Sequence, residues 1–253
     1  MSEPVLSVRK LTKRFGGLTA VNAVSMDVHA GEVVALLGDN GAGKSTLIKC
    51  VSGVHLAEEG EIYFEGQPRR FPRPIDARGA GIETIYQDLA LANNLDVPAN
   101  IFLGREKKRR YLGGLIKTLD EKLMLREAAG SLEALDIQFP SLTQPIESLS
   151  GGQRQAVAIA RAIYWDARLM IKDEPTNNLG VPEQHKVLEL IGKLREQGVP
   201  VILITHTLPD VFAVADRIIV MHRGRKVTEK KASETNTAEL VQYMVGALDD
   251  KLD

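Results

Sequence analysis

Cysteine is nearly absent from this sequence, which contains only Cys50 among its 253 residues. A single cysteine excludes an internal disulfide framework and any zinc site that is built on two or more cysteines. An excess of one charge is also missing, because 32 Lys and Arg residues face 33 Asp and Glu residues. Since general nucleic-acid-binding proteins carry a strong basic excess, we expect no nucleic-acid partner.

Long hydrophobic runs are missing as well. The longest, Val33–Leu37 and Val199–Ile204, fall far short of the roughly 18 residues that a membrane-spanning helix needs. The sequence starts MSEPVLSVRK, with no apolar run behind the first charges, which predicts no signal peptide. These absences predict a soluble, cytoplasmic protein whose link to any membrane comes from a partner.

What the sequence does contain is a series of short strand-like and helix-like segments. The segments at 33–37, 201–204 and 218–221 are continuously apolar, as in parallel strands covered on both faces. Val24–Val28 and Glu61–Glu65 alternate between apolar and polar residues, which is typical of half-exposed antiparallel strands. Two further short strands are expected at Leu6–Val8 and Leu169–Ile171. Helical periodicity runs through Ser45–Ser52, Leu119–Leu135, Gln153–Tyr164 and Glu183–Gln197.

The middle of the sequence has no strong signal for a buried strand and reads as mostly helical. We therefore expect one domain over 6–247, with an α/β core at about 6–88 and 159–247 and a helical insertion at about 89–158. Within the insertion, Arg105–Arg110 is a basic cluster. Most such clusters are solvated surface, and the alternative is contact with a partner or with lipid head groups.

A phosphate-binding loop is predicted at residues 38–45, which read GDNGAGKS and fit the pattern G-x-x-x-x-G-K-[ST]. A predicted strand precedes the loop and a predicted helix follows it, so backbone N–H groups and the helix N-terminus can face phosphates. We expect Lys44 to reach the β- and γ-phosphates and the Ser45 hydroxyl to ligate Mg²⁺. The candidate nucleotide contacts here are Gly38, Asn40, Gly41, Ala42, Gly43, Lys44, Ser45 and Thr46.

Further motifs narrow the family. Residues 149–153 read LSGGQ at the start of a predicted helix, and residues 169–176 read LMIKDEPT. They resemble the signature sequence and the Walker B strand with its catalytic glutamate in ABC-type ATPases. Gln87 in IYQD is similar to the glutamine loop of that family, His206 in LITH to its switch histidine, and Phe15 in KRFGG to the aromatic that stacks on adenine. The resemblance implies a P-loop NTPase core, with a mixed sheet, an antiparallel β edge and an inserted α-helical subdomain.

The resemblance also suggests a group within the family. The segments IETIYQDLALANNLDVPANIFLGRE, LSGGQRQAVAIARAI and DEPTNNLGVPE are similar to ATP-binding subunits of bacterial monosaccharide importers of the fructose/ribose/xylose type, in the single-cassette variety. This implies an ATP-hydrolysing subunit at the cytoplasmic face of the inner membrane. Its partners would be a separate permease and, indirectly, a periplasmic sugar-binding protein.

The family's mechanism assigns roles to these residues. Two cassettes, here expected to be a homodimer, sandwich two ATP molecules head to tail, so that the signature of one chain meets the γ-phosphate held by the other. That gives Ser150, Gly151, Gly152 and Gln153 a role in binding ATP. Glu174 is placed as general base and Asp173 as a ligand of hydrated Mg²⁺. The candidate catalytic residues are Lys44, Gln87, Glu174 and His206, and the candidate metal ligands are Ser45, Gln87 and Asp173.

Two departures from the family pattern stand out. Family members commonly have Asp in the loop after Walker B, where this sequence reads NNLG, and Gly180 has no side chain to cross a dimer interface. Lys172 interrupts an apolar strand immediately before Asp173. If the strand continues, Lys172 and Glu174 point the same way and the ammonium tunes the base. The alternative, which we favour, is that the alkyl stem of Lys172 runs along the sheet and its charge reaches solvent.

Three rival functions remain open at this point. A soluble ABC ATPase of translation or DNA repair tends to carry two cassettes, long coiled coils or zinc-binding cysteines, which one cassette with one cysteine fits poorly. An ATPase subunit for amino-acid import or for export shares the same motifs. A small-molecule kinase shares the phosphate loop, but it has no use for the LSGGQ segment.

Overall fold

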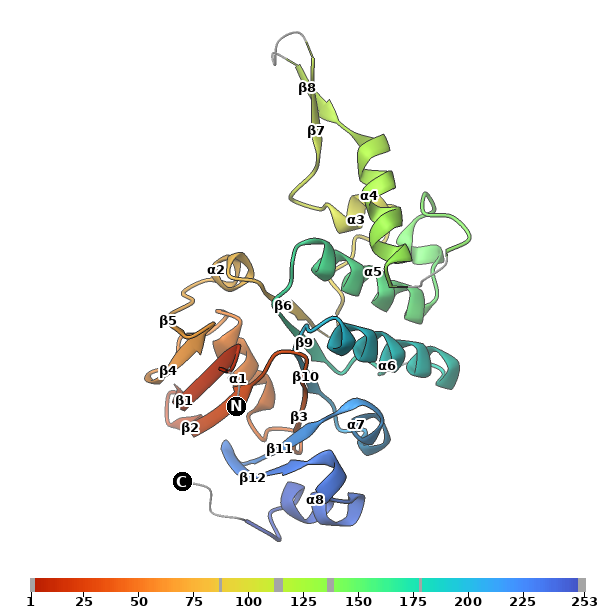
Figure 1. Ribbon diagram of the computed structural model, residues 1–253. Helices are drawn as coiled ribbons and strands as arrows, with labels where there is room; N and C mark the ends of the chain where they lie inside the picture. Colours follow the sequence, from red (N-terminus) through yellow and green to blue (C-terminus); the bar gives the residue numbers. More distant parts are fainter. Residues whose placement is uncertain (1–2, 87, 112–115, 136–138, 178, 250–253) are drawn as a thin grey trace. The chain divides into compact units, whose positions relative to one another are not determined.

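The computed structural model describes residues 3–86, 88–111, 116–135, 139–177 and 179–249 (Figure 1). The described chain falls into two compact units. The first comprises Met1–Gln87, Ala167–Pro175 and Ile191–Asp253, and the second comprises Asp88–Asp166 and Thr176–Leu190.

The strands are β1 (Leu6–Phe15), β2 (Leu18–Val28), β3 (Val33–Leu37), β4 (Glu59–Phe64), β5 (Gln67–Arg69), β6 (Ile82–Ile85), β7 (Lys108–Tyr111), β8 (Ile116–Leu119), β9 (Leu169–Asp173), β10 (Val201–Ile204), β11 (Arg217–His222) and β12 (Arg225–Lys231). The helices are α1 (Lys44–Val51), α2 (Pro74–Gly79), α3 (Val97–Ile101), α4 (Glu121–Glu133), α5 (Gly151–Tyr164), α6 (Val181–Glu196), α7 (Leu208–Val214) and α8 (Thr237–Met244), with 3-10 turns at Ile146–Ser148 and Ala232–Glu234.

A six-stranded sheet forms the centre of the first unit, in the order β12-β11-β3-β10-β9-β6. All its neighbouring strands run parallel except β11 and β12. Every residue of β3 and β10 is buried, which confirms the strands expected from continuous apolar runs. Ile204 pairs with both Leu36 and Asp173, so the carboxyl ends of β3, β10 and β9 meet at one edge of the sheet.

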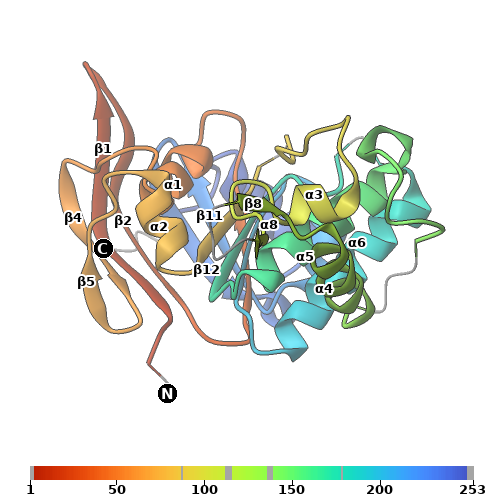
Figure 2. The ribbon, with the colours of Figure 1, turned by 90° about the horizontal axis from the view of Figure 1, so that it is seen from above.

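A second, antiparallel sheet of the order β2-β1-β4-β5 lies in the same unit (Figure 2). One hydrophobic core joins its inner face to α1 and to one face of the six-stranded sheet. That core includes Leu6, Val8, Leu47, Ile48 and Leu36. The prediction of a mixed sheet with an antiparallel β edge is therefore confirmed.

The other face of the six-stranded sheet is covered by α7 and α8. Ala35 and Leu37 of β3 pack there with Val211 and Leu240, whereas Leu36 belongs to the opposite core. This alternation is the two-residue period of a strand, and it explains why β3 needs apolar side chains at every position.

The second unit contains helices α3, α4 and α5, together with the hairpin β7–β8. The helices α4 and α5 confirm the periodicity that predicted them, but the hairpin was not expected within a mostly helical insertion. Its strand β7 reads KRRY and its residues Lys108–Arg110 are exposed. The apolar periodicity that reveals a buried strand is therefore missing. Among the described residues, no helix is both long and apolar enough to cross a bilayer.

Candidate functional site

The loop at residues 38–45 connects the buried end of β3 to α1, and two of its glycines have close backbone neighbours. Gly38 has φ +145°, and a Cβ there would lie 2.2 Å from the carbonyl oxygen of Met221. Gly43 has φ +102°, and a Cβ there would lie 2.4 Å from the carbonyl oxygen of Ala20. No side chain can fit at either position, so the loop's tight curl depends on glycine. The Ala42 carbonyl accepts a hydrogen bond from Gly224 N at 2.9 Å, which anchors the loop to the turn after β11.

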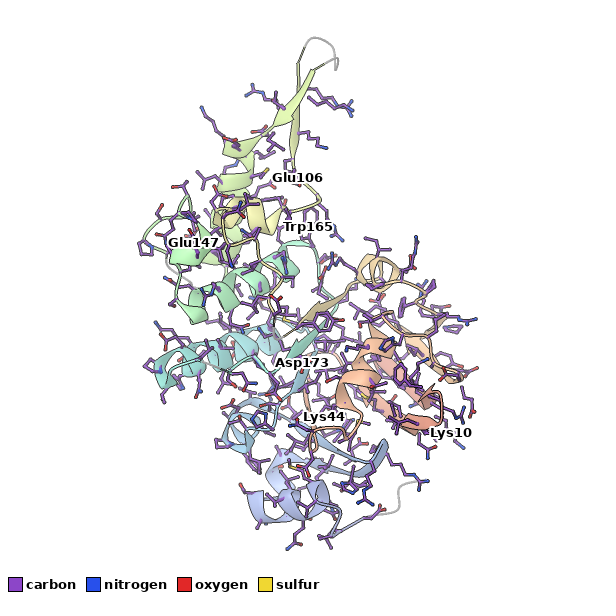
Figure 3. The ribbon with its side chains drawn as sticks, turned by 180° about the vertical axis from the view of Figure 1, so that it is seen from behind. Lys10, Lys44, Glu106, Glu147, Trp165 and Asp173 are labelled. Atoms are coloured by element: carbon purple, nitrogen blue, oxygen red, sulfur yellow. The ribbon has the colours of Figure 1, made fainter. Side chains whose placement is uncertain are left out.

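The lysine of this loop lies inside the curl. Lys44 is only 8% exposed, and its Nζ donates to the carbonyl oxygens of Gly38 at 2.6 Å and Asp39 at 3.1 Å. Burial lowers the pKa of the Lys44 ammonium, and the negative charges of Glu174, Asp173 and Asp39 oppose that shift. The ammonium is therefore held by two backbone carbonyls and interacts with nearby carboxylates. Figure 3 labels Lys44 and one of these carboxylates, Asp173.

The helix after this loop begins without a capping side chain. The residue preceding α1 is Gly43, and no side chain accepts a hydrogen bond from the first-turn amides of the helix. Such amides and the helix dipole favour an anion at this end. Ser45 and Asn40 are exposed here, as is Gly41, whereas Thr46 is half-buried and Ala42 is buried.

Two carboxylates and a histidine meet at the carboxyl edge of the six-stranded sheet. Asp173 is the last residue of β9, and burial, followed by the charge of Glu174, raises the pKa of its carboxyl against the opposing charges of Lys44 and Lys49. His206 follows β10, and its Nδ1 lies 2.9 Å from Glu174 Oε1. The other oxygen, Glu174 Oε2, is buried and has no hydrogen-bond partner among the described residues.

The backbone at Glu174 leaves the strand conformation. Its φ is +48°, and its N–H donates to the carbonyl of Ile204 at 2.8 Å. Because β9 ends at Asp173, the alternation of strand faces does not extend to Glu174. The premise that Lys172 and Glu174 point the same way on a continuing strand is therefore wrong.

The expectation that the charge of Lys172 reaches solvent is also wrong. Its side chain is 0% exposed. Strand β9 lies inside the sheet, with Leu203 of β10 and Ile85 of β6 beside Lys172, and side chains project from the faces of a sheet, so the face that Lys172 enters is covered. An alkyl stem cannot reach solvent from this interior position. Burial lowers the pKa of the Lys172 ammonium to about 7.

Phe15 ends β1 and offers an open aromatic face. The residue is 44% exposed, the His55 ring meets its edge with centroids 5.2 Å apart, and Lys13 Nζ lies 5.1 Å from its centroid. Sequence reasoning gave His55 no role, because no motif marks the residue that contacts Phe15 from a later loop. A partly exposed ring that is fixed by two neighbours can stack on a planar base.

The LSGGQ segment lies in the second unit, where it begins α5. Ser150 is the capping residue: its hydroxyl accepts from Gln153 N at 3.3 Å, and Gln153 Oε1 accepts from Ser150 N at 3.0 Å. A Cβ at Gly151 would lie 2.4 Å from the side chain of Leu179, and one at Gly152 would lie 3.2 Å from that of Glu183. The segment thus forms a capping box whose two glycines lie against neighbouring side chains.

Two residues singled out in the sequence lie outside the described part of the chain. Gln87, the expected glutamine-loop residue, is one of them, and Asn178 in the NNLG segment is the other. Gly180 of that segment is described and exposed, and a Cβ there would lie 2.7 Å from Glu183 Oε2.

The oxygen donors near Lys44 fit a magnesium ion. Within the described residues, no group of three or more His, Cys, Asp or Glu side chains could hold a metal on its own. Mg²⁺, however, binds through one or two protein oxygens, retained waters and substrate phosphates. The exposed Ser45 hydroxyl and the partly buried Asp173 carboxylate are donors of that kind.

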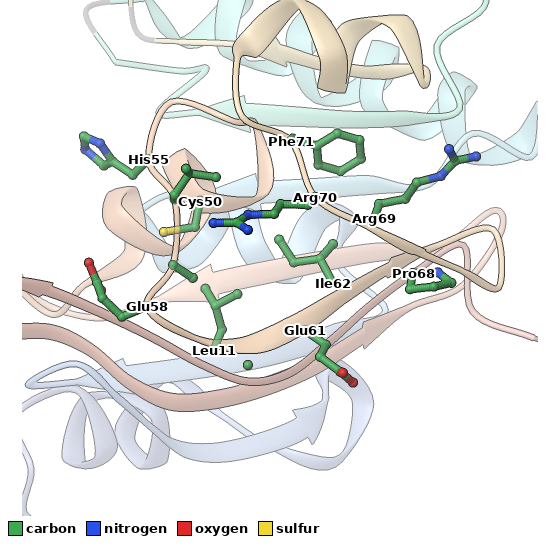
Figure 4. A pocket seen from close by; sticks show the side chains of 13 residues that line it. Leu11, Cys50, His55, Glu58, Glu61, Ile62, Pro68, Arg69, Arg70 and Phe71 are labelled. Atoms are coloured by element: carbon green, nitrogen blue, oxygen red, sulfur yellow. The ribbon is translucent and has the colours of Figure 1, made fainter.

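The first unit also contains a groove that is lined in part by His55, the residue that contacts Phe15. Its volume is about 410 Å³, and Leu11, Cys50, Ile62, Arg70 and Phe71 are among its lining residues (Figure 4). Burial raises the pKa of the Cys50 thiol to about 11, so the thiol is protonated at neutral pH. Because the thiolate is the reactive form, Cys50 is a packing residue.

The fold and the loop define the class first: a phosphate loop between a buried parallel strand and a helix, at the carboxyl edge of the sheet, is the architecture of P-loop nucleotide-binding proteins. The family described as "ABC transporter" matches residues 21–177, more than half of the chain. The chain therefore belongs to the ABC transporter family and is an ATP-binding cassette of it.

Relatives of similar length are sugar-import subunits by name. The chain is 48% identical to the xylose/arabinose import ATP-binding protein XylG of Sulfolobus acidocaldarius, over 95% of this chain and 93% of that protein. It is 44% identical to the fructose import ATP-binding protein FrcA of Rhizobium meliloti, over 97% and 95%. A ribose import ATP-binding protein, RbsA 2 of Escherichia coli O157:H7, is 40% identical over 97% of this chain, which spans only 47% of that relative.

Solved structures with this fold are also ATP-binding cassettes. One, an ATP-binding cassette of an ABC transporter in its ADP conformation, superposes with a TM-score of 0.80 at 26% identity and covers 96% of each chain. Another is the dimeric, post-hydrolysis state of a cassette bound to ADP and Pi. It has a TM-score of 0.73 at 25% identity and covers 90% of this chain and 98% of that chain.

Proposed function

We propose that this chain is the ATP-hydrolysing subunit of an ABC importer and that it drives the uptake of a monosaccharide through a separate permease. The observation that supports hydrolysis most directly is the arrangement of Glu174. One of its carboxylate oxygens is within hydrogen-bond distance of His206 Nδ1. The other oxygen is buried and has no hydrogen-bond donor among the described residues. The carboxylate also interacts electrostatically with Lys44. A buried acceptor of this kind is costly unless a donor reaches it, and an attacking water is such a donor.

Binding of ATP is assigned to the loop and to Phe15. The amides of residues Gly38–Thr46 and the Lys44 ammonium would hold the β- and γ-phosphates, while Phe15 stacks on adenine. Ser45 and Asp173 would hold Mg²⁺, with Gln87 as the third candidate. When bound, the ion neutralises charge that develops on the phosphates. When ATP binds, the Lys44 ammonium would exchange the carbonyl oxygens of Gly38 and Asp39 for phosphate oxygens.

The hydrolytic step is assigned to Glu174 and His206. Glu174 accepts the proton of the attacking water at its carboxylate, and its short distance to His206 fixes the orientation of that carboxylate. His206 is largely exposed, with 60% of its side chain accessible, so its ring can also turn toward a γ-phosphate. Both residues would be needed for full activity, and Glu174 more than His206.

A second copy of the chain completes each site in this proposal. Ser150, Gly151, Gly152 and Gln153 of one chain would approach the γ-phosphate held by the other, where the start of α5 favours an anion. The domain would extend over residues 6–247, with the helical insertion at about 89–158. The dimeric cassette with ADP and Pi that shares this fold supports the pairing.

The transport partners follow from the names of the relatives. Import ATP-binding proteins for xylose/arabinose, fructose and ribose resemble this chain at 40–48% identity. We assign the chain to the cytoplasmic face of the membrane, bound to a permease that receives sugar from a periplasmic binding protein. The chain itself would not contact the sugar.

Purification of the tagged chain from its native membrane tests this function. A permease that spans the membrane several times should be recovered with it, and the ATPase activity of that complex should rise with one of xylose, arabinose, fructose or ribose plus the matching binding protein. A Glu174→Gln complex should keep the permease and lose the stimulation. Recovery of ribosomal or DNA-repair proteins in place of a permease would contradict transport, and stimulation by an amino acid would contradict the sugar assignment.

A further inference from the structure

The basic cluster Arg105–Arg110 divides into two sets with different surroundings. Its first part contacts an aromatic cluster in the second unit: the Arg105 guanidinium lies 4.7 Å from the Trp165 ring centroid. Lys107 Nζ lies 5.4 Å from the Tyr164 centroid and 3.4 Å from Glu127 Oε2. These contacts are cation–π and ionic, and they account for Arg105 and Lys107 as structural residues.

The second set lies on the hairpin β7–β8 and has no such explanation. Lys108 pairs with Leu119 and Arg110 pairs with Lys117, and residues that are two apart or directly opposite share one face of a hairpin. We call these four residues the hairpin face. All four are exposed, and Leu119 is 51% exposed.

Among the described residues, the charge of the hairpin face is only partly balanced: the negative charge of Glu106 acts on Lys108. In the part of the chain that the structure describes, no carboxylate lies within ion-pair distance of Lys108, Arg110 or Lys117, and the sequence joining the two strands, LGGL, contains no charge. Arg110 lies directly opposite Lys117, and like charges at opposed positions destabilise a hairpin. An anionic surface would remove that repulsion.

We propose that the hairpin face binds the anionic head groups of the membrane that holds the permease. The inference rests on the proposed function, which places this chain at a membrane surface. The hairpin projects beyond α3 and α4 within its unit (Figure 1), so a planar surface can reach it. Each Lys or Arg near an anionic leaflet strengthens binding by about fivefold, and a half-exposed leucine between cations can enter the interface.

An acidic protein segment would satisfy the charges but gives no use to Leu119. A lipid surface uses both, because its head groups pair with the cations while its interface accepts the apolar side chain. The observations therefore favour lipid, and a protein partner is an outcome of the test.

The experiment measures binding of the full purified chain to vesicles by co-sedimentation. Phosphatidylcholine vesicles with and without phosphatidylglycerol are the probes, and no permease is present. The test variant is Lys108→Gln/Arg110→Gln/Lys117→Gln. The matched control is Arg69→Gln/Arg70→Gln/Lys186→Gln, which removes the same charge from three exposed positions elsewhere.

The wild-type chain should bind only vesicles that contain phosphatidylglycerol, and added salt should weaken the binding. The hairpin variant should lose at least about tenfold in affinity, and the control variant less than about twofold. Equal losses in the two variants would overturn the proposal, as would binding that ignores phosphatidylglycerol. The same comparison is then repeated with vesicles that contain the permease, and a hairpin effect seen only there would overturn the proposal in favour of a protein partner.

The proposed function is tested separately. Both variants should keep the ATPase activity of the permease complex in detergent, because none of the substituted residues belongs to the nucleotide site. Loss of vesicle binding with normal sugar-stimulated ATPase would support the hairpin proposal, and normal vesicle binding with no such ATPase would contradict the function alone. A vesicle-binding loss that is accompanied by unfolding in circular dichroism would be checked with Lys108→Gln alone, which should lose about fivefold.

Discussion

The chain has two helix starts that are assigned to phosphate, and they differ in how their amides are satisfied. The start of α1 has Gly43 as its capping residue and no side-chain cap, whereas α5 is closed by the reciprocal hydrogen bonds of Ser150 and Gln153. The first-turn amides of α1 are therefore available to an anion that binds to the same chain. The second satisfies its own donors, so a phosphate there must displace or supplement a cap that already exists. This difference predicts that ATP binds first to the α1 side and that the α5 side acts only in a dimer.

The largest expected effect comes from removing the cation on the α1 side. Lys44→Ala should lower hydrolysis by at least about 1000-fold and weaken ATP binding at least about tenfold, because the main positive contact to the phosphates is lost. Isothermal titration with ATP and a phosphate-release assay measure the two effects. Lys10→Ala, an exposed cation on β1, is the control and should change neither. Normal ATP turnover in Lys44→Ala would contradict the assignment of this loop as the ATP site.

A slightly smaller effect is expected at the catalytic carboxylate. Glu174→Gln should keep ATP binding and slow hydrolysis by about 100- to 1000-fold, since the amide keeps the shape but is a poor base. The ATP-bound variant should then form a dimer that light scattering detects. If this variant stays monomeric at saturating ATP, the isolated subunit does not use the α5 side in the way proposed.

The role of the α5 side can be tested with variants that separate the effect of a negative charge from the effect of a larger side chain. Gly151→Asp should leave ATP binding to the monomer intact and lower hydrolysis by about 100-fold, through repulsion of the partner's phosphate. A side chain at position 151 also meets Leu179, so each change is made in a Leu179→Ala background. In that background, Gly151→Ala should lower hydrolysis by less than about tenfold, and Gly151→Asp should still lose its hydrolytic activity. Equal losses would show that bulk, not charge, matters.

The smallest effect concerns stability and involves Lys172 in the first unit. Its pKa falls from 10.5 to about 7 on folding, so between these pH values the unfolded chain binds more protons than the folded one. The free energy of unfolding should therefore rise with pH over this window, by about 1 kcal/mol per pH unit. Lys172→Met should remove this slope and be more stable at pH 7. Urea unfolding at several pH values measures it, and parallel slopes for the two proteins would contradict the prediction.

The sequence predicted those parts of the fold that are buried on both faces. The apolar runs of β3, β10 and β11 are unmistakable, and the phosphate loop is recognisable because its glycines follow such a strand. The hairpin β7–β8 escaped detection because its exposed strands need no apolar side chains. Lys172 was misplaced because a lysine in a strand is usually assumed to reach solvent, while the interior position of β9 and the covering of its sheet face become visible only in the folded chain.

The candidate site was predicted motif by motif, and its internal contacts were not. The hydrogen bond between Glu174 and His206 depends on the register that pairs Ile204 with Asp173, and no local pattern gives a register between distant strands. The cap formed by Ser150 and Gln153 could have been predicted, because Ser followed three residues later by Gln is a capping-box sequence. The roles of these residues in catalysis stay predictions until the variants are measured.

The backbone of Glu174 has a consequence for how the site can be altered. A left-handed conformation costs a residue with a side chain about 1 kcal/mol or more, and Asn tolerates it better than Glu does. Replacing Glu174 by Asn should therefore leave the fold as stable as the wild type or more so, while hydrolysis is lost. On this view the glutamate is unfavourable for folding, and selection for thermal stability alone would remove it. A heat-resistant variant found without an activity screen should be checked first at this position.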